Sequence, residues 1–568
     1  MKLRFLALAG DSDCRRDLER AAKLGLADGL TKAHEGDSIS LWTLPGTPLI
    51  ASERGGTILA GLLFERGDAS RVTGLPADTH APLGFVRDFW GAYVLFTDLP
   101  GAHKVLRDPS GSVPVYFGSA GPMEIYASDS DLLLLALPGS PQPDLGFIRH
   151  WLSFPFLRSQ RTGIQGVREL LPGFCRHFAT GEEQLVQLWS PFDFTSTGPA
   201  ELTFEEAGAA LREELLRAIP CLAPEGEDVL LQLSGGLDSS IVAAALHHAG
   251  RPFRAVTFAT RSSDGDERPY ARMVAAACGV ELAELLEEQA DIDLERSLAG
   301  PLRPPPNPLL QPVHRAARLH FAATGPGIVL DGAGGDNVFA YLNTPVSALD
   351  AMRRRGLSAA IATLGDVAEL HGCTFWTAAR LAYRKRRRGY GEPWRRDCGF
   401  LTEAAVVHQP DPHPWLVPPE GTLQGSLDHV RMILGIQHFL FDPWPGAPAV
   451  LHPLLSQPLM ETCLKIPTWL WVRGGRDRAV ARAAFAGLLP EPILQRRGKG
   501  RLETMFLRGY RALRPRLEPF LLDGALAAGG IIDREAVRTA LAADQPAESG
   551  HIRLLEIVAA EQWLRSFG

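Results

Sequence analysis

The sequence predicts an α/β fold that combines a β-rich N-terminal domain with a larger C-terminal domain built on a parallel sheet. The chain has 568 residues, well beyond the ~250 to 300 at which single cores stop growing, so we expect two domains. Short apolar runs punctuated by Gly, Pro and Asp fill the first part, and apolar runs alternating with helical patterns fill the rest. A Ser/Thr/Gly/Pro segment at residues 191–199 divides them, which predicts domains at residues 1–195 and 200–568.

In the N-terminal domain, the short apolar runs predict strands at residues 90–96, 113–117 and 124–127. The first ten residues resemble a signal peptide, but their apolar part is short and Asp11 and Asp13 follow it. Alternating apolar residues from Leu3 onward instead predict a first strand.

In the C-terminal domain, strand and helix patterns alternate. We expect helices at residues 202–218, 240–248 and 268–278, and strands at residues 229–233, 255–259 and 328–330. This alternation is typical of a parallel sheet with helices on both faces. Ligands of such sheets bind at the carboxyl ends of the strands.

Composition excludes several classes of protein. A net charge of -7 argues against general nucleic-acid binding, which needs a basic surface. The basic run at residues 384–388 is interpreted as a solvated helix face in preference to a docking patch for an acidic peptide. Seven widely spaced cysteines without a C-x-x-C pair indicate neither a disulfide framework nor a zinc site. Without an apolar run of ~18 residues we expect no membrane association and a cytoplasmic location.

The strongest functional signal is a Gly-rich turn between the strand at 229–233 and the following helix. Its candidate ligands for ATP and pyrophosphate are Ser234, Gly235, Gly236, Asp238, Ser239 and Ser240. Backbone N–H groups and the helix dipole favour phosphate at such a turn, and the hydroxyls add donors. No Lys follows at the position that the G-x-x-x-x-G-K-[ST] loop requires, so the turn suits a pyrophosphate leaving group and predicts adenylate formation.

A second Gly-rich turn, residues 331–337, follows the strand at 328–330 and should lie at the same sheet edge. Asp238 and Asp336 would then converge on a hard cation, so we expect Mg²⁺ bridging them to the phosphates. Far downstream, Lys499 lies between two glycines. A lysine there could offset charge on the α-phosphate, although sequence alone favours a solvated surface lysine.

Taken in order, these elements resemble the asparagine synthetase superfamily over most of the chain. Further matches are Asp266-Glu267 with Tyr270-Ala271-Arg272 (family D-E-x-x-Y-A-R), Pro453-Leu454-Leu455, Arg497 with Lys499, and the N-terminal Arg107-Asp108-Pro109-Ser110-Gly111 with Pro114-Val115-Tyr116-Phe117. The resemblance implies an N-terminal glutaminase-like (Ntn-type) αββα domain and a C-terminal PP-loop synthetase domain, related to adenine nucleotide α-hydrolases. It gives Lys499 a catalytic role.

Two departures from the family pattern limit which of the family's reactions we expect of this chain. A working glutaminase of this family needs a cysteine directly after Met1, but Lys2 stands there, so we expect an inactive glutaminase-like domain and an amine supplied by the substrate itself. Ala333 occupies the place of the β-lactam synthetase tyrosine and cannot take a proton. The run from Gly332 to Phe339 is most similar to lasso-peptide cyclases, and β-lactam synthetases are the second choice.

The resemblance implies a macrolactam synthetase that adenylates an Asp or Glu side chain of a ribosomal precursor peptide. The peptide's own N-terminal amine then closes an isopeptide ring, with release of AMP and pyrophosphate. A leader peptidase and a leader-binding protein are the implied partners. Alternatives are a small-molecule amide or β-lactam-type synthetase and a non-catalytic scaffold. The base that accepts the amine proton stays open among His314, His452 and Asp331.

Overall fold

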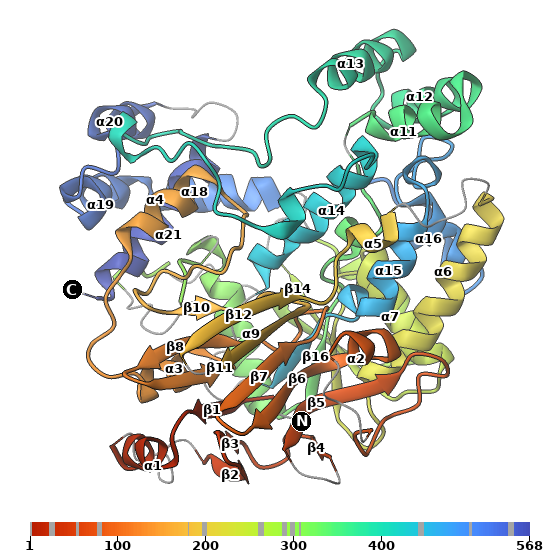
Figure 1. The fold of residues 1–568 in the computed structure, drawn as a ribbon. Coiled ribbons are helices and arrows are strands. Elements are labelled where there is room, and N and C mark those ends of the chain that lie inside the picture. The colour runs from red at the N-terminus through yellow and green to blue at the C-terminus, as the bar shows by residue number, and fades with distance from the viewer. Residues whose placement is uncertain are drawn as a thin grey trace.

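The computed structural model arranges the chain as three sheets, within the residues it describes, surrounded by helices (Figure 1). The described residues are 3–21, 29–52, 56–76, 82–179, 181–195, 202–259, 266–286, 292–295, 302–305, 308–342, 344–440, 448–498, 502–543 and 550–567. The predicted domain boundary near residue 200 and the candidate Lys499 lie outside them.

The described N-terminal residues form two six-stranded antiparallel sheets. The first has the order β10 (Arg168–Glu169), β8 (Tyr116–Ala120), β9 (Met123–Ala127), β1 (Phe5–Ala9), β3 (Ile39–Thr43) and β2 (Thr31–Glu35). The second has the order β12 (Glu182–Gln187), β11 (Phe174–Ala179), β7 (Ala102–Arg107), β6 (Phe89–Leu99), β5 (Thr57–Glu65) and β4 (Leu49–Ala51). The sheets pack face to face, and the rings of Phe5 and Phe96 lie 5.2 Å apart between them.

Short helices accompany these sheets. They are α1 (Ser12–Ala21), α2 (Pro82–Asp88), α3 (Ser130–Ala136), α4 (Leu145–Ser153) and α5 (Phe192–Thr195). The predicted strands at 90–96 and 124–127 lie within β6 and β9. The prediction at 113–117 is wrong for its first three residues, because β8 begins at Tyr116. Val113 and Val115 are buried in the core without belonging to a strand, so the apolar run that they form did not indicate one.

The described C-terminal residues contain a five-stranded parallel sheet. Its order is β15 (Leu282–Leu286), β14 (Arg254–Ala259), β13 (Val229–Gln232), β16 (Ile328–Leu330) and β17 (Ala449–Leu451). The strand order reverses between β13 and β16, which is where ligands bind in open α/β sheets. The predicted fold class, antiparallel sheets followed by a parallel-sheet domain, is confirmed.

Helices cover both faces of the parallel sheet. Phe321 on α9 (Gln311–Thr324) packs against Leu230 and Val329, whereas α7 (Leu237–His248) packs against Leu231 and Leu330 on the other face. Alternate residues of each strand therefore point to opposite helical layers, as the pleat requires. α8 (Arg268–Cys278) packs on β14 and β15, α6 (Phe204–Ala218) packs against α7, and α10 (Gly335–Val338) follows β16 in the chain.

The other described elements of the C-terminal part are helices joined by irregular segments. In Figure 1, α11 (Val346–Arg355), α12 (Leu357–Leu370) and α13 (Phe375–Arg388) project at the upper right. At the upper left lie α18 (Leu502–Leu522), α19 (Ala525–Ala528), α20 (Arg534–Ala542) and α21 (Gly550–Arg565). In the same view α14 (Gln424–Ile436) lies between these groups, and α15 (Gln457–Lys465) and α16 (Ala479–Ala484) lie at the right, near α6. The last of these helices is α17 (Glu491–Gln495). Short 3₁₀ turns occupy Pro220–Leu222, Pro308–Leu310, Glu403–Ala405, Pro414–Leu416, Gln437–Phe439, Pro453–Leu455 and Thr468–Leu470.

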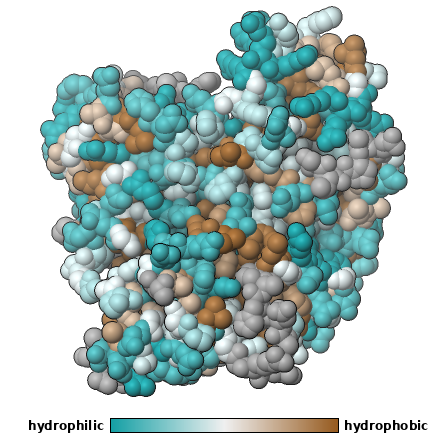
Figure 2. Space-filling model, viewed as in Figure 1, coloured by the Kyte–Doolittle hydropathy of each residue, from teal (hydrophilic) through white to brown (hydrophobic). Residues whose placement is uncertain are grey.

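The exposure of the basic run agrees with the expectation from the sequence. The basic run lies in the last turn of α13, where Arg384 and residues 386–388 are exposed, so it is a solvated helix face. Hydrophilic side chains dominate the face seen in Figure 2, with apolar side chains gathered near its middle. Within the described residues, no helix is both long and apolar enough to cross a bilayer.

The N-terminal sheets and the C-terminal sheet share one continuous hydrophobic core. Residues of β1, β5, β6, β13, β16 and α7 all belong to it. A buried ion pair reinforces the contact: Arg66, after β5, lies 2.6 Å from Glu461 on α15, and the Trp189 indole N–H donates to the same carboxylate at 2.9 Å. The two predicted domains are therefore packed as one body around this core.

Candidate functional site

The first Gly-rich turn joins β13 to α7, as predicted, but the helix begins at Leu237, three residues earlier than expected. Gly235 has φ +75°, and a Cβ there would lie 2.4 Å from the Ala271 nitrogen. Only glycine fits that conformation and that approach to α8. The hydroxyls of Ser234 and Ser239 lie 3.1 Å apart across the turn.

Most of the predicted phosphate ligands gather around one cavity of about 310 Å³. It is lined by Ser234, Gly236, Asp238 and Ser239 at the N-terminus of α7. Ser240 differs, since it is completely buried and its hydroxyl donates to the Gly236 carbonyl at 2.6 Å. Ser240 therefore stabilises the first turn of α7 and does not line the cavity. We call this space the nucleotide pocket.

The second Gly-rich turn contacts the first directly. A Cβ on Gly332 would lie 2.5 Å from the Ser239 nitrogen, and one on Gly335 would lie 2.3 Å from the Asp238 carboxyl carbon. Glycines at both places allow the two turns to touch. The predicted convergence at one sheet edge is thus what the structure shows, with Asp336 in the first turn of α10.

An arginine that the sequence reasoning missed joins the two carboxylates. One guanidinium nitrogen of Arg478 lies 3.0 Å from Asp238 and 2.5 Å from Asp336, and Nε lies 2.8 Å from Asp477. Burial lowers the pKa of Arg478, but the three carboxylates outweigh it and raise the pKa well above its usual range. Arg478 belongs to no short motif, and 142 residues separate it from Asp336, so no local signal could have indicated it.

The carboxylates also fit the predicted magnesium ion. Mg²⁺ is commonly held by one or two carboxylates plus substrate phosphates, and it prefers oxygen ligands. Asp238 and Asp336 already share one cation, the Arg478 guanidinium, so they are close enough to share another. Among the residues described, no group of three or more His, Cys, Asp or Glu side chains could hold a metal by protein ligands alone. The site therefore suits an ion that arrives with phosphates.

The late basic segment leads to the same pocket. Arg496 donates to Glu267 at 2.6 Å, its guanidinium lies 4.2 Å from the centre of the Tyr270 ring, and Glu267 lines the nucleotide pocket. The segment then leaves the described residues, so the position of Lys499 stays a prediction.

A second cavity, of about 290 Å³, adjoins the nucleotide pocket, and we call it the acceptor chamber. The two spaces share Gln232, Phe258, Asp331 and Ala333 in their linings. The chamber extends toward the N-terminal sheets and is lined further by Arg4, Arg107, Arg158, His314, Phe321, Ile436, Phe439 and His452, among others. The chamber therefore borders the nucleotide pocket at Asp331 and Ala333.

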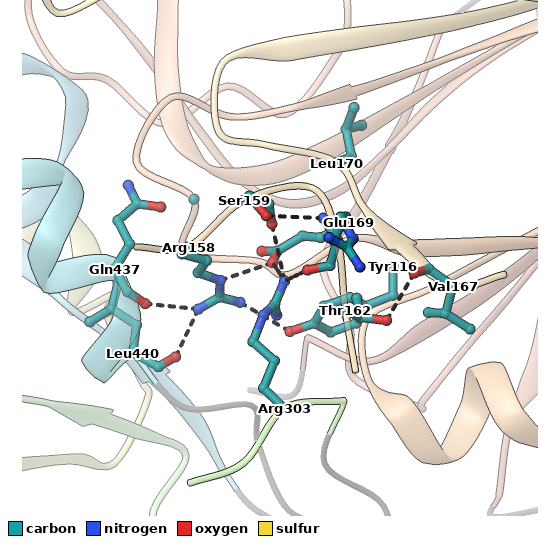
Figure 3. Close-up of polar contacts among 12 residues, drawn as sticks. Tyr116, Arg158, Ser159, Thr162, Val167, Glu169, Leu170, Arg303, Gln437 and Leu440 are labelled. Atoms are coloured by element: carbon teal, nitrogen blue, oxygen red, sulfur yellow. Dashed lines mark hydrogen bonds and ion pairs between the residues drawn. The ribbon is translucent and has the colours of Figure 1, made fainter. Parts of the chain in front are cut away.

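A buried cluster of charged side chains around Glu169 lies in the wall of this chamber, and Figure 3 shows Glu169 with Arg158 and Arg303. Glu169 lies 2.9 Å from Arg158, 2.6 Å from Arg303 and 2.7 Å from Arg107. Arg158 also donates to the carbonyls of Gln437 and Leu440, each at 2.9 Å. Burial raises the pKa of Glu169, but the three guanidinium groups outweigh it and hold this pKa well below its usual range. The cluster ties the chamber wall to the N-terminal sheets.

Asp331 and His452 lie side by side where the two cavities meet. The pairing of β16 with β17 puts Leu330 opposite Leu451, so the next residue of each strand is brought into register. The Nδ1 atom of His452 lies 2.9 Å from Oδ1 of Asp331, which also accepts the Ala333 N–H at 3.0 Å. Of the three candidates for the base, His314, His452 and Asp331, the structure thus brings His452 and Asp331 together.

Fold and site together define an α/β protein with two carboxylates beside the Gly-rich turns at the sheet edge and a second cavity next to them. The family model described as asparagine synthase matches residues 210–416 and 450–565, more than half of the chain. The chain belongs to the asparagine synthase family, which confirms the superfamily expected from the motifs.

Individual relatives match less of the chain. A carboxyethyl-arginine β-lactam-synthase from Streptomyces clavuligerus is 31% identical over 160 residues, which span 28% of this chain and 28% of that protein. An allosteric regulatory enzyme of purine biosynthesis shares 10% identity, with 50% of this chain and 80% of that one covered at a TM-score of 0.21. A glutamine phosphoribosylpyrophosphate amidotransferase from B. subtilis, complexed with ADP and GMP, shares 11% identity over 50% and 81%, also at 0.21.

Proposed function

We propose that the protein is an ATP-dependent macrolactam synthetase of the lasso-peptide cyclase type. It adenylates an Asp or Glu side chain of a ribosomal precursor peptide and closes an isopeptide ring with that peptide's N-terminal amine. The observation that carries the proposal is the junction of the nucleotide pocket with the acceptor chamber at Asp331 and Ala333. A carboxylate held there can face the α-phosphorus from one side and an amine from the other.

The residues of the pocket divide the work of the first step. The turn from Ser234 to Gly236 and the hydroxyl of Ser239 hold the pyrophosphate, because N–H and O–H donors gather there at a helix N-terminus. Asp238 and Asp336 would hold Mg²⁺, which offsets charge on the phosphate oxygens. Arg478 supplies a fixed cation beside both carboxylates. Lys499 is proposed to stabilise the charge that develops at the α-phosphate.

The chamber supports a peptide that reacts with itself. Its lining is largely apolar, with Phe258 at the junction and Phe321 and Ile436 among its other lining residues, and such a lining excludes water that would hydrolyse an acyl-adenylate. Holding amine and acyl carbon together makes ring closure nearly unimolecular, worth up to about 7–11 kcal/mol when the alignment is good. A leader peptidase and a leader-binding protein in the cytoplasm would supply the peptide under this proposal.

Pyrophosphate exchange and mass spectrometry test the proposal together. With synthetic leader-free peptides that carry Asp or Glu near position eight or nine, the protein should exchange labelled pyrophosphate into ATP and convert peptide to a product lighter by one water. Asp238→Asn should abolish exchange, whereas the same change at the exposed Asp523 should leave it intact. Formation of ADP and orthophosphate in place of AMP and pyrophosphate would refute the scheme.

A small-molecule synthetase is the second candidate, favoured by the partial match to the β-lactam-synthase. Exchange driven by a β-amino acid, with every peptide left linear, would establish it over the macrolactam proposal. A non-catalytic scaffold would show no exchange with either class of substrate.

A further inference from the structure

Amide formation requires a group that accepts a proton from the attacking nitrogen, and Ala333 at the junction cannot do so. The pair formed by His452 and Asp331 lies at that junction, at the carboxyl ends of two adjacent parallel strands. The side chains are 14% and 19% exposed, so both are sheltered yet open to the chamber. Because the strand register fixes both positions, the pair needs no induced movement to form.

The hydrogen bond determines which nitrogen of the imidazole is available. The Asp331 carboxylate can only accept, so Nδ1 of His452 carries the proton at 2.9 Å and Nε2 keeps its lone pair. The Ala333 N–H holds the other side of the same carboxylate oxygen at 3.0 Å. Asp331 therefore sets both the tautomer and the orientation of the ring, as a carboxylate does for a catalytic histidine.

The charges around the pair keep His452 basic. Burial lowers the pKa of His452, but the Asp331 charge and hydrogen bond outweigh it and raise the pKa above its ordinary value. The other charged or titratable groups that line the chamber are Arg4, Arg107, Arg158 and His314. Burial lowers the pKa of His314, which makes it a weaker base than His452.

We propose that His452 is the general base for amide formation and that Asp331 is its positioning residue. The inference rests on the proposed function, since it assigns a role in the second step of that reaction. The neutral amine nitrogen attacks the acyl carbon, and the C–N bond forms. Nε2 of His452 accepts the proton that the nitrogen loses, the bond from the acyl carbon to the AMP oxygen breaks, and AMP leaves with the electron pair. The imidazolium then returns its proton to solvent.

Separate assays of the two half-reactions test His452. Pyrophosphate exchange reports adenylation, ring closure of the synthetic peptide reports the whole reaction, and hydroxylamine traps the acyl-adenylate as a hydroxamate. In His452→Gln we expect ring closure to fall by about 10²–10⁴-fold, the usual contribution of a general base. Exchange and hydroxamate formation should stay within about twofold, because hydroxylamine is a small, weakly basic amine whose adduct loses its proton readily to water. His248→Gln, on the exposed end of α7, is the matched control and should close rings normally.

Two further measurements distinguish a base from a structural residue. Added imidazole should restore part of the ring closure in His452→Gly, but not in Asp238→Asn. The rate should rise with pH through the His452 pKa, since the neutral ring is the active form. Asp331→Asn removes the charge that raises this pKa, so the rising limb should move to lower pH while the maximum rate falls.

The possible outcomes distinguish failure of this inference from failure of the proposed function. Normal ring closure by His452→Gln, or equal loss of exchange and closure, would overturn the inference and leave the macrolactam proposal standing. Wild-type exchange with β-amino acids alone would overturn the macrolactam proposal, and His452 would then be judged by the same variants on amide formation from that substrate. Absence of exchange with any substrate would refute both.

Discussion

Replacing Glu169 by Gln should destabilise the protein severely, although the two side chains have nearly the same shape. The carboxylate is 1% exposed and lies within 2.9 Å of Arg107, Arg158 and Arg303. A neutral amide would leave three guanidinium groups without the charge that compensates them. Breaking a buried ion pair by removing one partner costs about 3–5 kcal/mol. The urea dependence of a chain of 568 residues exceeds the ~3 kcal/mol/M of small proteins, so the midpoint of unfolding should fall by up to about 1 M.

Urea unfolding at two pH values provides the assay. The pKa of Glu169 is held below its usual range in the folded protein, so its contribution to the free energy of unfolding is present above the unfolded pKa of about 4.3 and is lost as pH falls below it. The difference in unfolding midpoint between wild type and Glu169→Gln should therefore be largest near pH 7 and should become smaller below about pH 4. Glu225→Gln is the control, because Glu225 pairs with Arg251 at the surface, where such a pair contributes about 0–1 kcal/mol. Equal midpoints for Glu169→Gln and wild type at pH 7 would refute the reasoning.

Three other changes test the nucleotide pocket. Arg478→Met should lower stability by about 3 kcal/mol, because it removes a buried cation from three carboxylates, Asp238, Asp336 and Asp477. Mg²⁺ should raise the melting temperature of the variant more than that of wild type, and no difference in the response to Mg²⁺ would argue against a cation site shared by Asp238 and Asp336. Gly235→Ala should reduce the rate of pyrophosphate exchange at least about tenfold, since its Cβ would collide with the backbone of α8. Gly250→Ala is the control: at φ +65° it carries the same kind of backbone strain, but it has open space around it and should exchange pyrophosphate at the wild-type rate. Lys499→Gln should slow adenylation by about 10²–10³-fold with little loss of stability, and unchanged exchange would remove this lysine from the mechanism.

The sequence predicted the parallel sheet and its two Gly-rich turns well because local pattern carries that information. The helix at 268–278 and the strand at 328–330 agree with the structure residue by residue. The helix of the phosphate loop began too late in the prediction, because Asp238 and Ser239 are poor helix formers in the interior and good ones in a first turn. Local propensity could not show that these two polar residues occupy that turn.

Contacts between distant segments escaped prediction for a different reason. Arg478 meets Asp238 across 240 residues, and the Asp331–His452 pair spans 121. Each depends on strand order and register, which a single sequence does not disclose. The chamber wall likewise needs Glu169 of one domain and Arg303 of the other, and neither residue stands in a recognisable motif.

The common core of the N-terminal and C-terminal sheets limits how this chain can be re-engineered. Cutting the chain near residue 200 would expose the apolar faces of β5 and β6 on one fragment and those of α6 and α15 on the other. Exchange of one half between homologues would also replace one side of the acceptor chamber while keeping the opposite side. Chimaeras of this architecture must therefore carry both halves from the same parent, because the shape of the chamber depends on the two halves together.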